Sequence, residues 1–363
     1  MNDLVEVLKS AVQSGASDIH LVVGKPPMMR LHGEVVPIHN FKPLEEESSK
    51  AMIYSVLLEN QRMKLEENLE LDASFGIEGV ARFRINAFYQ INGVEAVMRV
   101  IPSKIPSPEE IELTPTITNL AKLPRGLVLV TGPTGSGKST TLACMLELIN
   151  QQESVNILTI EDPVEFSYTN KQSVFRQREI GQSTKSFSAA LRSAMRQDPD
   201  VILVGEMRDL ETIQLAVTAA ETGHLCFGTL HTQDAPSTVD RIIDVFPPHQ
   251  QTQIRVQLAS TLQAVVSQVL LPRKDGNGRI AARELMIVTP AISNMIRESK
   301  THMIPNAIET GGKFGMVSMD KAMANLVRRG VISFEEAATK AKSPESFRQL
   351  CSGGSISSYG EDS

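Results

Sequence analysis

Residues 132–139 read Gly-Pro-Thr-Gly-Ser-Gly-Lys-Ser, a complete match to the phosphate-loop pattern G-x-x-x-x-G-K-[ST]. The pattern lies between an apolar run at 126–131 and a helix-prone stretch at 140–149. Such a strand leads the chain into a tight loop whose glycines let backbone N–H groups converge on phosphate, and the next helix points its positive end at the same place. A plain glycine turn would leave the lysine and the hydroxyls after it without a purpose. We therefore predict a nucleotide-binding α/β domain.

The loop also predicts which residues hold the nucleotide and its metal ion. Lys138 is expected to reach the β- and γ-phosphates, and the hydroxyl of Ser139 is expected to bind Mg²⁺. ATP and Mg²⁺ are thus the expected cofactors. The predicted nucleotide-binding residues are Gly132, Pro133, Thr134, Gly135, Ser136, Gly137, Lys138, Ser139 and Thr140.

Composition narrows the class of protein. The chain has 363 residues, of which 41% are hydrophobic and 21% charged, as in soluble globular proteins of more than one domain. A net charge of −6 argues against a broad basic face for nucleic acid. No apolar run is long enough to span a bilayer, and the N-terminus lacks the features of a signal peptide, so we expect a cytoplasmic protein without direct membrane insertion. The three cysteines form no Cys-x-x-Cys pair, which argues against a structural zinc site.

The chain divides into a smaller and a larger part. Residues 1–100 combine an amphipathic first helix and a second helix over 48–59 with short strands broken by glycine and proline turns, which predicts an α+β domain. Residues 101–125 contain five prolines and are predicted to be a stiff linker. From 126 to 351, apolar runs alternate with helical stretches, which predicts a largely parallel sheet with ligands at the carboxyl ends of its strands. The Gly/Ser-rich tail at 352–363 is predicted to be flexible and disordered.

Two apolar strands of the larger part end in acids. Glu161 follows the run at 155–160 and is predicted to orient or deprotonate an attacking water, with a helix cap or turn as the alternative. Glu206 follows residues 201–204, a hydrophobic strand of the Walker B form. Because Gly205 occupies the position of the usual magnesium-linked aspartate, Glu206 is expected to reach Mg²⁺ through water or to act as a second candidate base.

The polar residues near these strand ends fit more than one role. Glu206 with Arg208 and Asp209 also fits a solvated salt-bridge cluster. His231 lies at the carboxyl end of the strand at 225–230 and is predicted to hydrogen-bond the γ-phosphate as a sensor. His224, at the other end of that strand, fits this role less well, and lone histidines are commonly packing or surface residues.

Three arginines of the first part are candidates for a further phosphate contact. Strand alternation puts Arg82 and Arg84 on one face, and Arg99 lies one strand later. Because the loop domain has no obvious arginine finger of its own, these residues could reach a γ-phosphate across a domain or subunit boundary. Surface arginines on a half-exposed sheet are the alternative.

Together with Ala-Ser-Asp-Ile-His at 16–20, these segments resemble the secretion-ATPase superfamily, the motors of type II and type IV secretion and of pili. Five segments occur in the family's order, including the unusual Gly-Glu, and the resemblance spans about residues 1–350. Within the superfamily the chain resembles the PilT-type ATPases, which drive type IV pilus retraction in twitching motility. The resemblance implies an N-terminal PAS-like domain and a C-terminal RecA-like ATPase domain, assembled as a homohexamer with ATP between the domains.

The resemblance also implies residue roles and partners. Glu161 would be the catalytic acid, Glu206 the Walker B acid and His231 the sensor, with the phosphate-contacting arginines among the three described above. The implied partners are an inner-membrane pilus platform protein and, as a further candidate, a paralogous retraction ATPase. The protein would then lie in the cytoplasm, peripheral to the inner membrane at the pilus base. The alternatives are a related secretion or pilus-assembly ATPase, a nucleotide-dependent regulator, and a nucleic-acid translocase, against which the net charge argues.

One segment relates to the direction of the motor. The retraction motif of the family usually reads A-I-R-N-L-I-R-E, whereas residues 291–298 read A-I-S-N-M-I-R-E. Ser293 and Met295 depart from it, and Arg297 and Glu298 agree with it. The absence of a four-cysteine insert, which extension ATPases usually carry, favours retraction.

Overall fold

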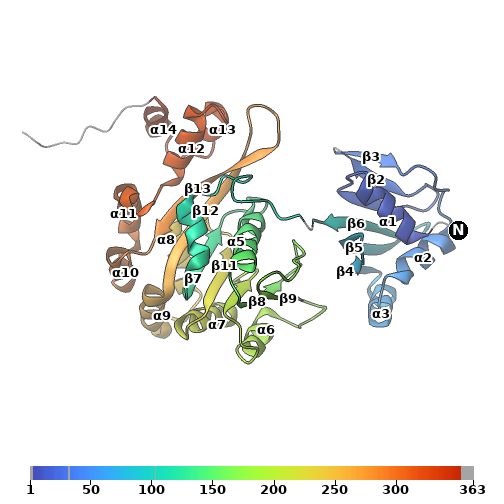
Figure 1. The fold of residues 1–363 in the computed structure, drawn as a ribbon, viewed down its shortest axis with the longest axis horizontal. Coiled ribbons are helices and arrows are strands. Elements are labelled where there is room, and N and C mark those ends of the chain that lie inside the picture. Colours follow the sequence, from blue (N-terminus) through green and yellow to red (C-terminus); the bar gives the residue numbers. More distant parts are fainter. Residues whose placement is uncertain (1–2, 32, 103, 353–363) are drawn as a thin grey trace, which may run out of the picture. The chain divides into compact units, whose positions relative to one another are not determined.

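A computed structural model describes residues 3–31, 33–102 and 104–352 and divides them into two units (Figure 1). The first unit comprises the described residues up to Lys104 together with Glu165–Tyr168. The second comprises Ile105–Val164 and the described residues from Thr169 onward. Of the predicted tail at 352–363, all but Ser352 lies outside the described residues.

In its described residues, the first unit is an antiparallel sheet with three helices. Its strand order is β3-β2-β1-β6-β5-β4. The strands are β1 Asp18–Leu21, β2 Met28–Leu31, β3 Glu34–Pro37, β4 Glu70–Ile77, β5 Ala81–Gln90 and β6 Gly93–Ile101. The helices are α1 Leu4–Gln13, α2 Glu46–Ser55 and α3 Glu59–Asn68. Apolar side chains of α1, α2 and the strands form one core, and the predicted α+β character is confirmed.

The second unit is built on a seven-stranded sheet of order β13-β12-β7-β11-β10-β8-β9. Only the β12–β13 pair is antiparallel among the pairs of this sheet that the structure describes. The strands are β7 Gly126–Thr131, β8 Asn156–Glu161, β9 Val174–Glu179, β10 Val201–Val204, β11 Leu225–Leu230, β12 Leu262–Pro272 and β13 Arg279–Ile287. Because β7, β10 and β11 are buried along their whole length, their sequences are continuous apolar runs.

The helices of the second unit fall into two groups in chain order, those before β12 and those after β13. The first group comprises α4 Pro115–Asn119, α5 Lys138–Gln152, α6 Phe187–Ala194, α7 Leu210–Glu221, α8 Ala235–Asp244 and α9 Pro248–Thr261. The second group comprises α10 Pro290–Arg297, α11 Ile304–Thr310, α12 Met319–Arg328, α13 Phe334–Ala338 and α14 Pro344–Cys351. In addition, 3₁₀ turns occur at Leu120–Lys122, Thr301–Met303 and Gly311–Phe314. Helices α12 to α14 pack on the ends of β12 and β13 in a small core of their own (Figure 1).

The structure differs from the sequence prediction in three places. The helix expected near 48–59 is two helices, α2 and α3. Strand β9 was not predicted, because its last four residues are all polar or charged and it lies at the edge of the sheet. Of the proline-rich segment 101–125, residues 105–125 belong to the second unit and contain α4. Among the described helices, none has the length and hydrophobicity of a membrane-spanning segment.

Candidate nucleotide site

The phosphate loop joins β7 to α5. Three of its glycines have positive φ, 140° at Gly132, 75° at Gly135 and 87° at Gly137, which side chains other than glycine rarely adopt. Helix α5 begins at Lys138 directly after Gly137. Residues 133–135 at the tip of the loop and Ser139 are exposed. The loop therefore presents backbone N–H groups and a helix N-terminus at an accessible place.

Lys138 folds back over this loop. Its ammonium donates to the carbonyl oxygens of Gly132 at 2.8 Å and Pro133 at 3.1 Å. Burial lowers the pKa of Lys138, and the negative charge of Glu206 offsets part of this effect. The ammonium thus lies at the mouth of the loop within the electrostatic influence of an acid from another strand.

Glu206 and His231 come together from neighbouring strands. Oε1 of Glu206 lies 2.9 Å from Nε2 of His231 and also pairs with Arg208. Burial raises the pKa of Glu206, but the hydrogen bonds and charges of Arg208 and His231 outweigh burial and hold it below its ordinary value. At neutral pH Glu206 is therefore an ionised oxygen donor, the type that Mg²⁺ prefers.

Glu161 is more deeply enclosed. The residue is 7% exposed, and its Oε1 accepts hydrogen bonds from Oγ1 of Thr159 at 2.6 Å and Nε2 of Gln177 at 3.3 Å. Gly205 packs directly on it: a Cβ added at Gly205 would lie 2.9 Å from the carbonyl oxygen of Ile160 and 3.1 Å from Cα of Glu161. This close contact explains why glycine, and not aspartate, precedes Glu206.

The alternatives for the neighbouring polar residues are resolved in part. Arg208 does pair with Glu206, but Asp209 caps α7 by accepting from the backbone N–H of Thr212 at 2.9 Å. Nδ1 of His224 lies 2.9 Å from the carbonyl oxygen of Ala219, at the opposite end of β11 from His231. His224 therefore closes the end of α7 and takes no part in the site.

The three arginines lie in the first unit. Arg84 and Arg99 are direct partners on β5 and β6, so they share a face with Arg82. Nη2 of Arg82 donates to Oγ of Ser74 at 2.8 Å, and Nε of Arg99 donates to Asp18 at 3.0 Å. The Ala-Ser-Asp-Ile-His segment thus supplies a carboxylate to Arg99. Which of the three arginines contacts phosphate stays a prediction.

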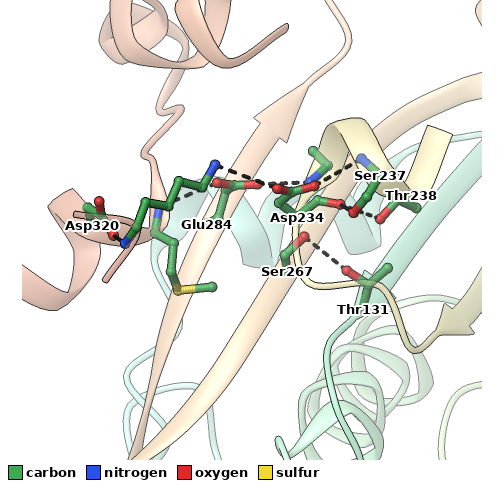
Figure 2. Close-up of polar contacts among 10 residues, drawn as sticks. Thr131, Asp234, Ser237, Thr238, Ser267, Glu284 and Asp320 are labelled. Atoms are coloured by element: carbon green, nitrogen blue, oxygen red, sulfur yellow. Dashed lines mark hydrogen bonds and ion pairs between the residues drawn. The ribbon is translucent and has the colours of Figure 1, made fainter. Parts of the chain in front are cut away.

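Two buried polar contacts that the sequence did not reveal fix the chain around this site. Oγ1 of Thr131, at the end of β7, donates to Oγ of Ser267 on β12 at 2.9 Å (Figure 2). Ser267 lies directly opposite Glu284 on β13, and Glu284 accepts at 2.9 Å from the N–H of Ala235, the first residue of α8 (Figure 2). Because α8 follows His231 closely, the buried Glu284 carboxylate anchors the far end of the loop that carries the histidine.

Two further features belong to the surroundings of the site. A cavity of about 390 Å³ adjoins the start of α5 and is lined by Thr140 and Thr141, with Arg273 and Arg279 among its other walls. Its volume lies in the range of small-ligand pockets. The segment at 291–298 forms most of α10, in which Ile292 and Ile296 are buried, Met295 is half-buried and Arg297 is exposed.

The fold and this arrangement define an α/β protein with a phosphate-loop motif and acids at neighbouring strand ends. Residues 1–285 match the family model described as "Type II/IV secretion system protein", and the chain belongs to this family. The resemblance and the fold class inferred from the sequence are therefore confirmed.

Several relatives cover nearly the whole chain. It is 53% identical to the "Type IV pilus retractation ATPase PilT" of Pseudomonas aeruginosa, over 95% of this chain and 100% of the relative. It is 38% identical to the "Type IV pilus ATPase PilU" of the same organism, over 97% and 92% of the two chains. A crystal structure of the pilus retraction motor PilT with bound ADP matches with a TM-score of 0.89 and 46% identity, covering 96% of this chain and 100% of that one.

Proposed function

We propose that the protein is an ATPase whose hydrolysis of ATP powers the retraction of type IV pili, and with it twitching motility. Similarity over the whole chain to a retraction ATPase, and to a retraction motor crystallised with ADP, supports this function. The single observation that carries ATP hydrolysis is the convergence of Lys138, Glu206 and His231 beside the phosphate loop. A module that only binds nucleotide does not need two separate acids at strand ends.

Each side chain then has a role in the reaction. Lys138 binds the β- and γ-phosphates, and the hydroxyl of Ser139 with the ionised Glu206 forms an oxygen donor set that fits Mg²⁺. When bound, Mg²⁺ neutralises negative charge on the phosphates. Glu161, oriented by hydrogen bonds from Thr159 and Gln177 among others, positions or deprotonates the attacking water. His231 contacts the γ-phosphate, and its contact with Glu206 couples that acid to the presence of the γ-phosphate.

The test of this function has two parts. The purified protein is expected to hydrolyse ATP, and its gene is expected to restore pilus retraction in a strain that lacks its own retraction ATPase. Hydrolysis without retraction would indicate another motor of the family. Binding of nucleotide with no turnover would favour a regulator instead.

We infer further that the protein works as a homohexamer in the cytoplasm, peripheral to the inner membrane at the pilus base. Its proposed partners are the pilus platform protein and a paralogous retraction ATPase. If arginines from one subunit complete the site of another, mixing Lys138→Ala subunits with Arg84→Ala subunits should restore part of the activity. The same test applies to Arg82 and Arg99. No recovery for any of the three, in rings shown to be mixed, would contradict action between subunits.

A further inference from the structure

One buried amide on β12 contacts both the phosphate loop and the first turn of the helix that follows it. Gln268 is a polar residue in a largely apolar strand, and it is only 1% exposed. Its Nε2 donates to the carbonyl oxygen of Ser136 at 2.7 Å, and its Oε1 accepts from Oγ1 of Thr141 at 3.0 Å. Ser136 lies within the loop, and Thr141 lies in the first turn of α5. The amide therefore bridges the two sides of Gly137 and Lys138.

The backbone of Gln268 adds a third contact. A Cβ added at Gly132 would lie 2.2 Å from the carbonyl oxygen of Gln268, and one added at Gly137 would lie 3.2 Å from its Nε2. Because both glycines also have positive φ, other residues are disfavoured there by conformation and by space. The loop thus lies directly against one residue of the neighbouring strand.

These contacts bear on the direction of a peptide N–H. A trans peptide is planar, so the N–H of Gly137 points opposite to the C=O of Ser136. Since Gln268 holds that C=O toward β12, the N–H of Gly137 is directed away from β12. Backbone N–H groups of such loops are the donors that bind phosphate.

We propose that Gln268 is a positioning residue of the phosphate loop, whose amide sets the orientation of the Ser136–Gly137 peptide before nucleotide binds. The proposal rests on the nucleotide binding proposed above. Thr141 acts through Gln268, because its hydroxyl donates to Oε1 and so leaves the NH₂ group facing Ser136. A loop that is already fixed in its binding conformation avoids an ordering cost on association. Loss of the Gln268 amide should therefore weaken the binding of both ADP and ATP.

The test is ADP affinity measured by calorimetry on the full chain. Gln268→Met keeps the volume of the side chain and removes both hydrogen bonds, and we expect about a tenfold weaker affinity, equivalent to about 1.4 kcal/mol. The matched control is Gln263→Met on the same strand, because the Gln263 amide donates to Thr261 and makes no hydrogen bond to the loop. The control should bind ADP as the wild type does.

Three further readouts separate positioning from a merely structural role. In steady-state hydrolysis by Gln268→Met, KM should rise in parallel with the ADP dissociation constant, while kcat changes by less than about threefold. Thr141→Val should weaken binding and Thr141→Ser should restore it. The double variant Thr141→Val with Gln268→Met should bind no more weakly than Gln268→Met alone, since both changes disrupt one interaction.

The outcomes distinguish the two proposals. If the wild type binds ADP and folded Gln268→Met binds it equally well, the positioning role is wrong while the proposed function stands. If Gln268→Met does not fold, equal ADP affinities of Thr141→Val and Thr141→Ser would overturn the positioning role. If the wild type itself binds no ADP, the proposed function fails first, and the positioning role fails with it.

Discussion

Replacing Gly205 with alanine should slow ATP hydrolysis and leave ADP binding nearly intact. The new Cβ would lie 2.9 Å from the carbonyl oxygen of Ile160, whereas ordinary contacts begin at 3.4 Å, so the ends of β8 and β10 must separate by about 0.5 Å. The strain falls on the hydrogen bond from the N–H of Gly205 to Ile160, now 2.7 Å long, and on Glu161 beside it. Overpacking of this kind costs about 1–3 kcal/mol. A misplacement of about 1 Å can lower a rate ~10²-fold, so a displacement of about 0.5 Å should lower kcat roughly tenfold.

The assay combines kcat for ATP hydrolysis, ADP affinity and the melting temperature. Gly312→Ala is the matched control, because an added Cβ at Gly312 meets no atom within 4 Å and its φ is not in the left-handed region. The control should retain wild-type kcat. A wild-type kcat in Gly205→Ala would refute the argument that this contact positions a catalytic Glu161. An equal loss of ADP binding would show that the substitution distorts the whole site.

Three further predictions address the site and its coupling to motion. Lys138→Ala should lower turnover by about 10² to 10³, because the phosphates lose a positioned cation, and wild-type turnover in the purified variant would end that assignment. Glu161→Gln and Glu206→Gln should bind nucleotide but hydrolyse it slowly. If one of them traps ATP and the other loses its Mg²⁺ dependence, the first is the base; near-normal rates in both would reject the pair. Alanine at both Arg297 and Glu298 should leave ATPase largely intact and block retraction, giving piliated cells that do not twitch, whereas a parallel loss of ATPase and motility would contradict a separate coupling role.

The sequence predicted best those elements whose burial is uniform. Strands β7, β10 and β11 are buried at every position, so their apolar runs and the polar residues that follow them could be located directly. The acids and the histidine at the strand ends follow from this pattern, because parallel strands bring their carboxyl ends to one edge. An edge strand gives no such signal. In β9 only the first two residues are apolar and residues 176–179 are all polar or charged, so the sequence of this strand resembles that of a loop.

The residues that would contact phosphate could be predicted from the sequence. The residues that shape the loop could not, because their hydrogen-bond partners are distant in the chain. Thr131 and Ser267 are 136 positions apart, and Gln268 is 132 positions from Ser136. One signal was nevertheless present: Ser267 and Gln268 interrupt the apolar sequence that forms β12. Buried polar groups are nearly always hydrogen-bonded, so a polar pair at that position requires a polar partner nearby. The phosphate loop must be held against a neighbouring strand, and it is the polar partner that the fold supplies. Polar residues that interrupt the apolar strand beside β7 therefore indicate, from sequence alone, which residues position the loop.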